Sequence, residues 1–217
     1  MDNKSIVKTL KLFAQLLELH EENPFKIKNF TNANFKLSKY AEPLFSKSLE
    51  DLAKIEGVGK SAASKIIEFI ETGVMEELEA LKQITPAGII DMLQIKGIGP
   101  KKIRIIWTEL NIDTIGELYY ACNENRLVEA KGFGYKTQED VKKQIEFFWS
   151  NTGKNLYANA LMIANEFEAY LKKEIKDIFI ECTGEMRRKC EIIHQIEFLL
   201  ITTNKSDLQL VITEKLA

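Results

Sequence analysis

The sequence predicts a mainly α-helical fold with a small C-terminal α+β part. Apolar residues recur at helical spacing up to about Asn151, and strand-like alternation is essentially absent from this stretch. Glycines and prolines interrupt the pattern at short intervals, as they do at helix boundaries. Beyond about Ile175, β-branched and apolar stretches replace the helical pattern. We therefore expect helices first and a few strands near the end.

The helical part begins with an amphipathic helix over residues 2–20, with Asp2 or Asn3 as its N-cap. Residues 25–40 follow Asn23-Pro24 and predict a second helix or two short ones. Further helices are expected at residues 48–55, 60–72, 75–83, 87–93, 100–110, 114–123 and 137–151.

The C-terminal part begins after a break at residues 151–154. A long helix is expected at residues 155–173, followed by strands at 175–181, 192–202 and 208–213, with a basic turn at Arg187 and Arg188 between two of them. We place a domain boundary near residues 150–155.

The composition is that of an ordinary globular protein, with 30 Lys and Arg against 32 Asp and Glu. Because the net charge is close to zero, any anion-binding surface has to be local. The two histidines lie far apart and offer little from which to build a transition-metal site. Three cysteines without CxxC spacing, and no apolar run of membrane-spanning length, predict a soluble, cytoplasmic protein with no membrane partner.

A short glycine pattern recurs along the chain. Its copies are Gly57-Val58-Gly59, Gly97-Ile98-Gly99 and, more loosely, Gly132-Phe133-Gly134. Each has the form Gly, apolar, Gly between two predicted helices, and lysines follow each copy, namely Lys60, Lys101, Lys102 and Lys136. A recurring local pattern indicates a reused structural unit.

The pattern suits a helix-hairpin-helix turn. The first glycine can adopt the positive φ that ends one helix, the apolar residue packs between the helices, and the second glycine leaves the next helix N-terminus bare. Bare N–H groups at the positive end of a helix dipole form a site for a phosphate oxygen. Such contacts reach the DNA backbone and not the base edges, so binding is expected to be independent of sequence.

Other interpretations of the glycines are weaker. One such turn alone is more often only structural, but three copies with the same flanks favour a binding role. A P-loop or a dinucleotide fingerprint does not fit, because GxxxxGK[ST] is absent and the turns join helices.

These motifs resemble the amino-terminal half of family X DNA polymerases, in particular bacterial relatives of DNA polymerase beta. The resemblance runs over nearly the whole chain. It rests on Glu22-Asn23-Pro24-Phe25-Lys26, the first hairpin with residues 65–73, Gly97-Ile98-Gly99-Pro100, and Gly184-Glu185-Met186-Arg187-Arg188-Lys189.

The resemblance implies tandem helix-hairpin-helix domains at residues 1–85 and 86–152, followed by a partial nucleotidyltransferase-like palm at 153–217. The implied partner is gapped, nicked or primer-template DNA, held during repair. It also implies a Na⁺ or K⁺ at the hairpins, held by the main-chain carbonyls of Ala53, Ile55 and Val58, and of Leu93, Ile95 and Ile98.

The resemblance further implies 5′-deoxyribose phosphate lyase chemistry, in which a lysine amine attacks a sugar aldehyde to give a Schiff base. Lys65 matches the position of the nucleophile, and Lys26 matches a contact to the 5′-phosphate. Phe30 stands where mammalian members have a tyrosine, and Ser61 replaces a phosphate-binding lysine. Lys65 is thus either the lyase nucleophile or a helix lysine that contacts solvent or phosphate.

The palm motif departs from the family pattern. Gly184-Glu185 replaces Gly-Ser, Arg187 and Arg188 are kept, and Gln195 and Glu197 stand where two aspartates should hold divalent ions. An amide lacks the charge that a metal pair needs, so Mg²⁺ and polymerisation are not expected unless this palm is active after all.

Several alternatives stay open at this point. The chain is either a fragment of a longer protein, which in bacterial relatives carries a C-terminal phosphoesterase domain, or a short form whose palm is structural. It is a DNA-binding scaffold, an enzyme acting as lyase or polymerase, or a protein-interaction module. The preferred DNA structure and the oligomeric state are not predicted.

Overall fold

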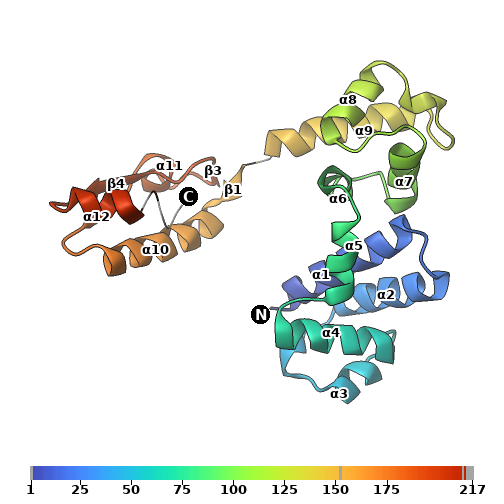
Figure 1. Ribbon diagram of the computed structural model, residues 1–217, viewed down its shortest axis with the longest axis horizontal. Coiled ribbons are helices and arrows are strands. Elements are labelled where there is room, and N and C mark those ends of the chain that lie inside the picture. Colours follow the sequence, from blue (N-terminus) through green and yellow to red (C-terminus); the bar gives the residue numbers. More distant parts are fainter. Residues whose placement is uncertain (1, 152, 212, 214–217) are drawn as a thin grey trace. The chain divides into compact units, whose positions relative to one another are not determined.

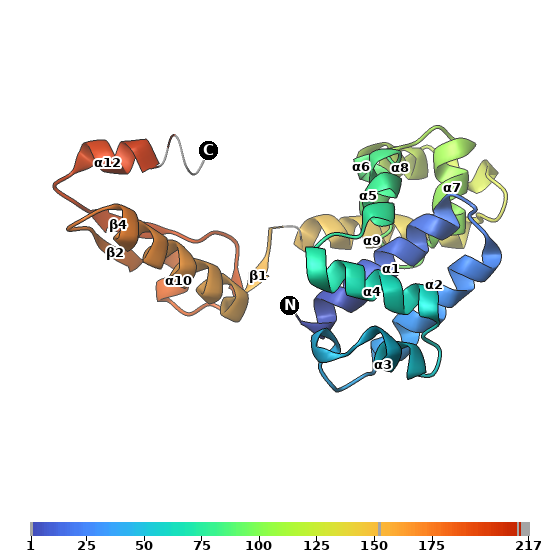
Figure 2. The same cartoon turned by 60° about the horizontal axis from the view of Figure 1, so that its bottom comes forward.

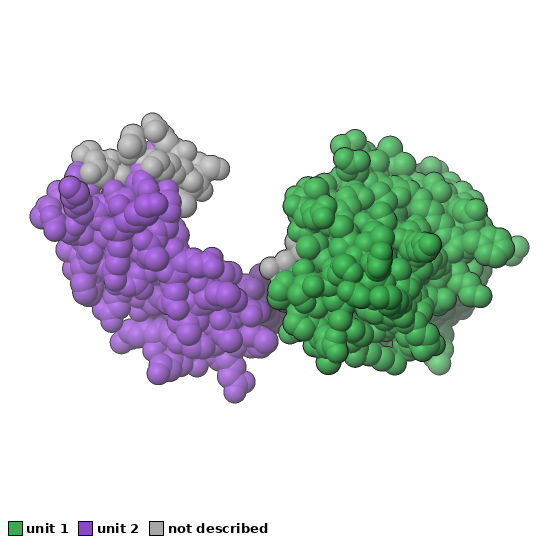
Figure 3. All heavy atoms as spheres, turned by 90° about the horizontal axis from the view of Figure 1, so that it is seen from below, with its two compact units in different colours: residues 1–148 green, residues 149–217 purple. Residues whose placement is uncertain are grey.

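The structure, a computed structural model, describes residues 2–151, 153–211 and 213. The chain divides into two compact units, residues 1–148 and residues 149–217 (Figure 3). The first unit is helical, and the second combines helices with two small sheets (Figure 1). The predicted fold class is therefore confirmed.

The first unit is built from α-helices and two short 3-10 helices. Their bounds are α1 Asn3–Leu19, α2 Pro24–Leu37, η1 Leu44–Ser46, α3 Leu49–Lys54, α4 Lys60–Thr72, α5 Glu76–Gln83, α6 Ala87–Met92, α7 Pro100–Thr108, α8 Ile115–Asn123 and η2 Leu127–Glu129, with α9, Tyr135–Asn151, continuing past the end of the unit. Most boundaries lie within two residues of the prediction, since glycine, proline and capping residues fix them locally.

Helices α1 and α2 show how the sequence sets these elements. The Asp2 side chain caps α1 by accepting a hydrogen bond from the Ser5 N–H at 2.8 Å. Asn23 caps α2, which begins at Pro24 and runs as one helix. The two helices pack through Phe13 and Phe30, whose rings meet edge to face with centroids 4.7 Å apart.

One hydrophobic core runs through the first unit. Its fully buried side chains extend from Ile6 in α1 to Ile145 in α9, across the two ranges expected to be separate helix-hairpin-helix domains. Arg104 in α7 also donates a hydrogen bond to the Leu19 carbonyl at the end of α1, at 2.9 Å. The two halves share this core, and the division at residue 85 stays a prediction.

The second unit contains β1 Asn155–Leu156, α10 Tyr157–Glu174, β2 Phe179–Cys182, α11 Gly184–Arg187, β3 Ile192–Ile193, β4 Phe198–Ile201 and α12 Lys205–Leu210. Strand β1 pairs with β3, and β2 pairs with β4, both antiparallel. Figure 2 shows α10 beside the β2–β4 pair. Leu171 and Ile175 at the end of α10 are buried in the same small core as Ile180 of β2.

Three predictions for this unit were wrong. Residues 192–202 do not form one strand, because β3 and β4 belong to different sheets. The basic residues expected in a turn belong instead to α11, which Arg187 ends and Arg188 caps. The expected strand at 208–213 begins as α12, since Leu208 and Val211 are three residues apart and share a helix face that packs on the core around Leu171. Ile212 lies outside the described residues.

Over the described part of the chain, no helix combines the length and the apolar character needed to cross a bilayer. The three cysteines are free thiols. Burial raises the pKa of the Cys122 thiol to about 11, so this side chain behaves as a small core hydrophobe.

Candidate nucleic-acid interface

The three glycine turns have the same backbone conformation. The first glycine of each copy has a positive φ, at +84° for Gly57, +90° for Gly97 and +88° for Gly132. Residues with a Cβ are disfavoured there, which explains why glycine recurs at this place in the pattern. The conformation expected from the sequence is present in every copy.

The middle residue of each turn is buried as expected. Val58 is 3% exposed, Ile98 4% and Phe133 7%. The N–H of Val58 donates to the Ile55 carbonyl at 2.9 Å, and that of Phe133 donates to the Ala130 carbonyl at 3.1 Å. These residues anchor each turn between its two helices, so the following glycine is held in a fixed place.

The second glycine is followed at once by a helix. Gly59 is the N-cap of α4 and Gly99 the N-cap of α7, and neither helix receives a side-chain capping hydrogen bond. Helix α9 begins at Tyr135, directly after Gly134. The first N–H groups of a helix have no partner within it, so they remain available for an anion.

The surroundings of the turns differ. A Cβ added at Gly97, Gly99, Gly132 or Gly134 would meet no atom within 4 Å, so the second and third turns are open to a ligand. The first turn is covered by α2. A Cβ at Gly57 would lie 2.8 Å from Lys36 Cγ, and one at Gly59 would lie 3.0 Å from Asn29 Oδ1.

Lys36 and Asn29 were not predicted as site residues. They are seven residues apart on α2, so they lie on the same face, and this face lines the first turn. Lys36 Nζ is paired with Glu56 at 2.8 Å. The seven-residue spacing of Asn29 and Lys36 is visible in the sequence. Only the packing of α2 against α4 shows that this face of α2 lies against the hairpin.

The lysines that follow the turns remain at the surface. Lys60, Lys101 and Lys136 are exposed. Lys101 Nζ lies 3.9 Å from the Glu18 carboxylate, and Lys102 Nζ lies 5.4 Å from the centroid of the Phe133 ring. Lys102 follows the second turn and Phe133 belongs to the third, so these two turns are neighbours in space.

The candidate lyase residues are both in ion pairs. Lys65 Nζ lies 2.7 Å from Glu68, with the two side chains 26% and 24% exposed. The hydrogen bond from Lys65, followed by one from the Glu76 N–H, holds the pKa of Glu68 below its usual value. Lys26 is paired instead with Glu77. Phe30 is fully buried beside Phe13, which makes it a core residue.

Among the candidate palm residues, Glu185 is held by contacts with His194. Its carboxylate accepts a hydrogen bond from the His194 N–H at 2.7 Å and lies 3.0 Å from His194 Nδ1. The backbone hydrogen bond from His194 is the largest cause that lowers the pKa of Glu185.

The space beside Gly184 is filled by the Glu197 side chain. Gly184 has φ +55°, and a Cβ there would lie 1.6 Å from Glu197 Oε2. Gln195, Glu197, Arg187 and Arg188 are exposed. No group of three or more metal-binding side chains occurs among the described residues.

The expected Na⁺ or K⁺ sites stay predictions. The Ile55 carbonyl already accepts the Val58 N–H, and its second lone pair is the one that a cation would use.

Comparison with known proteins gives the same picture of the first unit. A helix-hairpin-helix domain model matches residues 1–75, and a model of a SAM-like helix-hairpin-helix tandem matches residues 89–146. The "DNA polymerase/3'-5' exonuclease PolX" of Bacillus subtilis (strain 168) is 28% identical over 209 residues, or 96% of this chain.

The chain contains helix-hairpin-helix domains and is similar to a bacterial family X DNA polymerase. The resemblance predicted from the sequence is thereby confirmed. The chain spans 36% of the length of the Bacillus relative.

Proposed function

We propose that the chain binds the sugar-phosphate backbone of DNA through its hairpins without reading the base sequence. The observation that carries this proposal is the common geometry of the turns, each with a positive-φ glycine, a buried apolar residue and a helix that begins directly after the second glycine. Repeated anion sites at helix N-termini suit regularly spaced phosphates, and they touch no base edge.

The preferred substrate in this proposal is duplex with a short gap or nick, or a primer-template. Fluorescence anisotropy would compare a gapped duplex carrying a 5′-phosphate with intact duplexes of two unrelated sequences. We expect equal affinity for the two sequences and a steep loss of affinity with salt, since each neutralised phosphate contributes about −0.9 to the slope of log K against log salt. A flat salt response would contradict backbone binding, and no measurable affinity at moderate salt would favour the protein-interaction alternative.

The proposed Na⁺ or K⁺ at the hairpins can be tested in the same assay. Replacing K⁺ by tetramethylammonium at constant ionic strength should weaken binding if carbonyl-bound cations bridge to phosphates, because this bulky ion cannot be coordinated by carbonyl oxygens. Unchanged affinity would remove the cation from the interface.

We also propose that this chain performs no nucleotidyl transfer. The support is local: Glu185 places a carboxylate where the related motif has a serine, and Gln195 offers no charge for a metal ion. Primer extension with Mg²⁺ and all four deoxynucleotides should give no product under conditions where the gapped duplex is bound. Extension by the wild-type chain that is lost in Glu197→Gln would overturn this part.

The lyase is the alternative that the structure gives a reason to test. Lys65 and Glu68 form a half-buried ion pair on α4, the helix that begins at the first hairpin. Borohydride trapping on an incised abasic duplex should crosslink the wild-type chain and not Lys65→Ala if Lys65 is the nucleophile. Lys11→Ala is the control, because it removes an exposed lysine of α1 that lies outside every hairpin. Equal trapping by the wild-type chain and Lys65→Ala would exclude Lys65.

A cytoplasmic location remains a prediction from the cysteine pattern, and fractionation of cells that express this chain would test it.

A further inference from the structure

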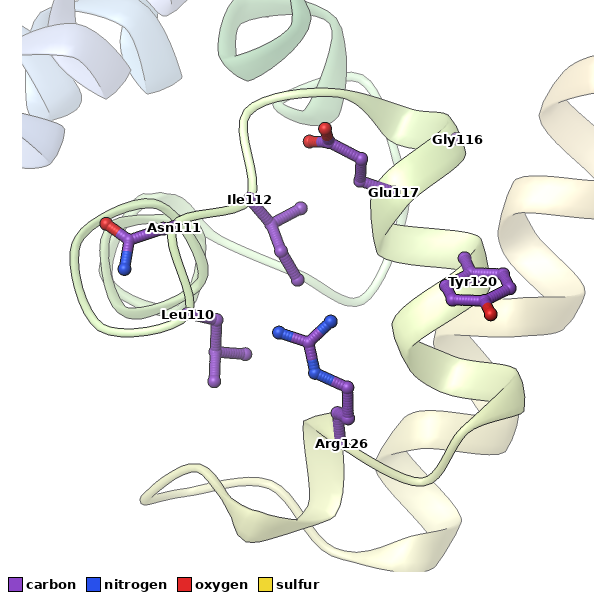
Figure 4. Close-up of a pocket in the computed structure, with 7 residues that line it drawn as sticks. All are labelled: Leu110, Asn111, Ile112, Gly116, Glu117, Tyr120 and Arg126. Carbon is purple, nitrogen blue, oxygen red and sulfur yellow. The ribbon is translucent and has the colours of Figure 1, made fainter.

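A pocket of about 350 Å³ lies at the end of α7 that is remote from the second hairpin. Leu110, Asn111 and Ile112 form one wall after α7, and Gly116, Glu117 and Tyr120 of α8 form the other (Figure 4). Arg126 enters from the segment just before η2, and its guanidinium points into the space between Leu110, Ile112 and Tyr120 (Figure 4). The lining combines one positive charge with apolar surface.

The walls are fixed by the backbone. The Ile112 N–H donates to the Ile106 carbonyl at 3.2 Å, and Asn111 adopts φ +53° to make the turn that ends α7. Helix α8 begins with a capping box, in which Thr114 caps the Glu117 N–H. The Glu117 carboxylate accepts hydrogen bonds from the N–H groups of Asp113 and Thr114, at 3.2 and 3.3 Å. Its charge is therefore already engaged by the backbone.

Arg126 is positioned but not paired. Its N–H donates to the Ala121 carbonyl at 2.9 Å, and Asn125 before it adopts φ +59°, so the backbone at this residue is defined. Within the described ranges, no carboxylate lies within ion-pair distance of the Arg126 guanidinium. Arg104, by comparison, is held by Glu21 at 2.8 Å and by the Leu19 carbonyl. A guanidinium binds a carboxylate or a phosphate through two parallel hydrogen bonds, so Arg126 gives the pocket a donor that suits an anion.

The local charge distinguishes between anions. Arg126 is the one cation lining the pocket, and Glu117 is also in the lining. Glu124 lies beside the pocket, where its carboxylate is hydrogen-bonded to the Tyr120 hydroxyl. A nucleic-acid backbone, with a charge on every phosphate, would meet these carboxylates at close range. A single carboxylate needs only the one guanidinium, which can bind it through two parallel hydrogen bonds.

We propose that this pocket is the docking site for a peptide segment of a protein partner that carries a single acidic residue between apolar ones. One Asp or Glu carboxylate of the segment pairs with Arg126, and an adjacent apolar side chain lies against Leu110 and the exposed ring of Tyr120. Arg and Tyr are the residue types that most often anchor protein interfaces, and both are exposed here.

This inference goes beyond DNA binding and does not depend on it. The proposed phosphate site of the second hairpin is at the first residue of α7, and the pocket follows its last residue. Nine helical residues separate the two by roughly 13 Å, so a short peptide in the pocket leaves the second hairpin uncovered.

The test uses the full chain labelled with ¹⁵N and follows the Arg126 Nε–H and Gly116 N–H signals by NMR. The probe is the capped tripeptide acetyl-Leu-Asp-Leu-amide, and its counterpart acetyl-Leu-Asn-Leu-amide lacks only the charge. We expect saturable shifts with the Asp peptide, with a Kd on the order of 1 mM, and at least fivefold weaker binding of the Asn peptide. Arg126→Met should abolish the shift at Gly116, while Lys11→Met, an exposed lysine of α1, should leave it unchanged.

A third probe separates the two classes of anion. Adenosine monophosphate should shift the two signals less than the Asp peptide does. Equal binding of the Asp and Asn peptides, preference for the nucleotide, or no saturable shift with the Asp peptide would each overturn the proposal. Because the Asp and Asn peptides are compared on the unchanged chain, the result does not rest on the folding of any variant.

Discussion

The ammonium group of Lys102 lies 5.4 Å from the centroid of the Phe133 ring. Lys102 is in the first turn of α7, directly after the second hairpin, and Phe133 is the buried apolar residue of the third hairpin. The contact is a cation–π pair between two copies of the repeat. It places the second and third hairpins side by side, so that in the proposed complex they would contact neighbouring phosphates.

Lys102→Met should weaken DNA binding and lower the salt slope. If Lys102 neutralises one phosphate, its loss removes about 0.9 from the slope of log K against log salt, equally for all DNA sequences. Fluorescence anisotropy at several salt concentrations measures both quantities. Lys11→Met, on α1 and outside any hairpin, is the control that should keep the wild-type slope. A slope unchanged in Lys102→Met would mean that this lysine serves only to hold Phe133.

Gly97→Ala should disturb the second hairpin through its backbone alone. No atom lies within 4 Å of the added Cβ, but φ +90° is unfavourable for alanine. We expect a cost of about 1–2 kcal/mol, seen as faster amide exchange of residues around the turn and as weaker DNA binding. Gly116→Ala also adds a Cβ in open space, but within α8, so it should be neutral or slightly stabilising. Equal exchange in both variants would show that positive φ is not what selects glycine here.

Gly184→Ala should destabilise the second unit. The added Cβ would overlap Glu197 Oε2, and φ +55° disfavours alanine as well. Glu197 is exposed and can rotate away, so the backbone conformation is expected to carry most of the cost, about 1–2 kcal/mol. This cost is measured by hydrogen exchange of the β2–β4 amides. The single variant is compared with the double variant, Gly184→Ala with Glu197→Ala. Full recovery in the double variant would assign the effect to the contact instead.

Protonation of His20 in mild acid should make the first unit less stable. Burial lowers the pKa of His20, the charge of Arg104 lowers it further, and Glu22 opposes them. The Thr85 hydroxyl donates to the Leu81 carbonyl and so accepts from His20 Nε2, at 2.7 Å, which places a proton on Nε2. Since the folded pKa is depressed, the stabilisation is present above the unfolded value of 6.5 and is lost as the pH falls through the folded pKa.

The measurement is urea unfolding at about pH 7.5 and about pH 5.5 for the wild type and His20→Gln. The wild type should lose more stability than the variant between the two conditions, because glutamine does not titrate. Comparing the pH differences removes the constant effect of the substitution and the titration of the carboxylates. The same loss in both proteins would contradict a role for His20.

Local signals predicted most of the first unit. The Asn23-Pro24 start of α2, the glycines of the turns and the capping residue Thr114 each act within a few residues, so the helix ends and the positive φ of Gly57, Gly97 and Gly132 could be expected. The strand predicted at residues 208–213 was wrong because strand propensity is also a local signal, and a weak one. Packing of Leu208 and Val211 on the core favours the helix instead.

The sequence by itself determined the helical fold, the repeated hairpin and the likeness to family X polymerases. The tertiary structure decided which residues meet: Lys36 over the first hairpin, Lys102 beside Phe133, Glu185 on His194, and Arg126 without a partner in its pocket. The physical reason is the separation along the chain over which each interaction acts. Turn and capping preferences depend on neighbours along the chain, whereas charge pairing and burial depend on residues brought together by packing, whose separation in sequence no local pattern specifies.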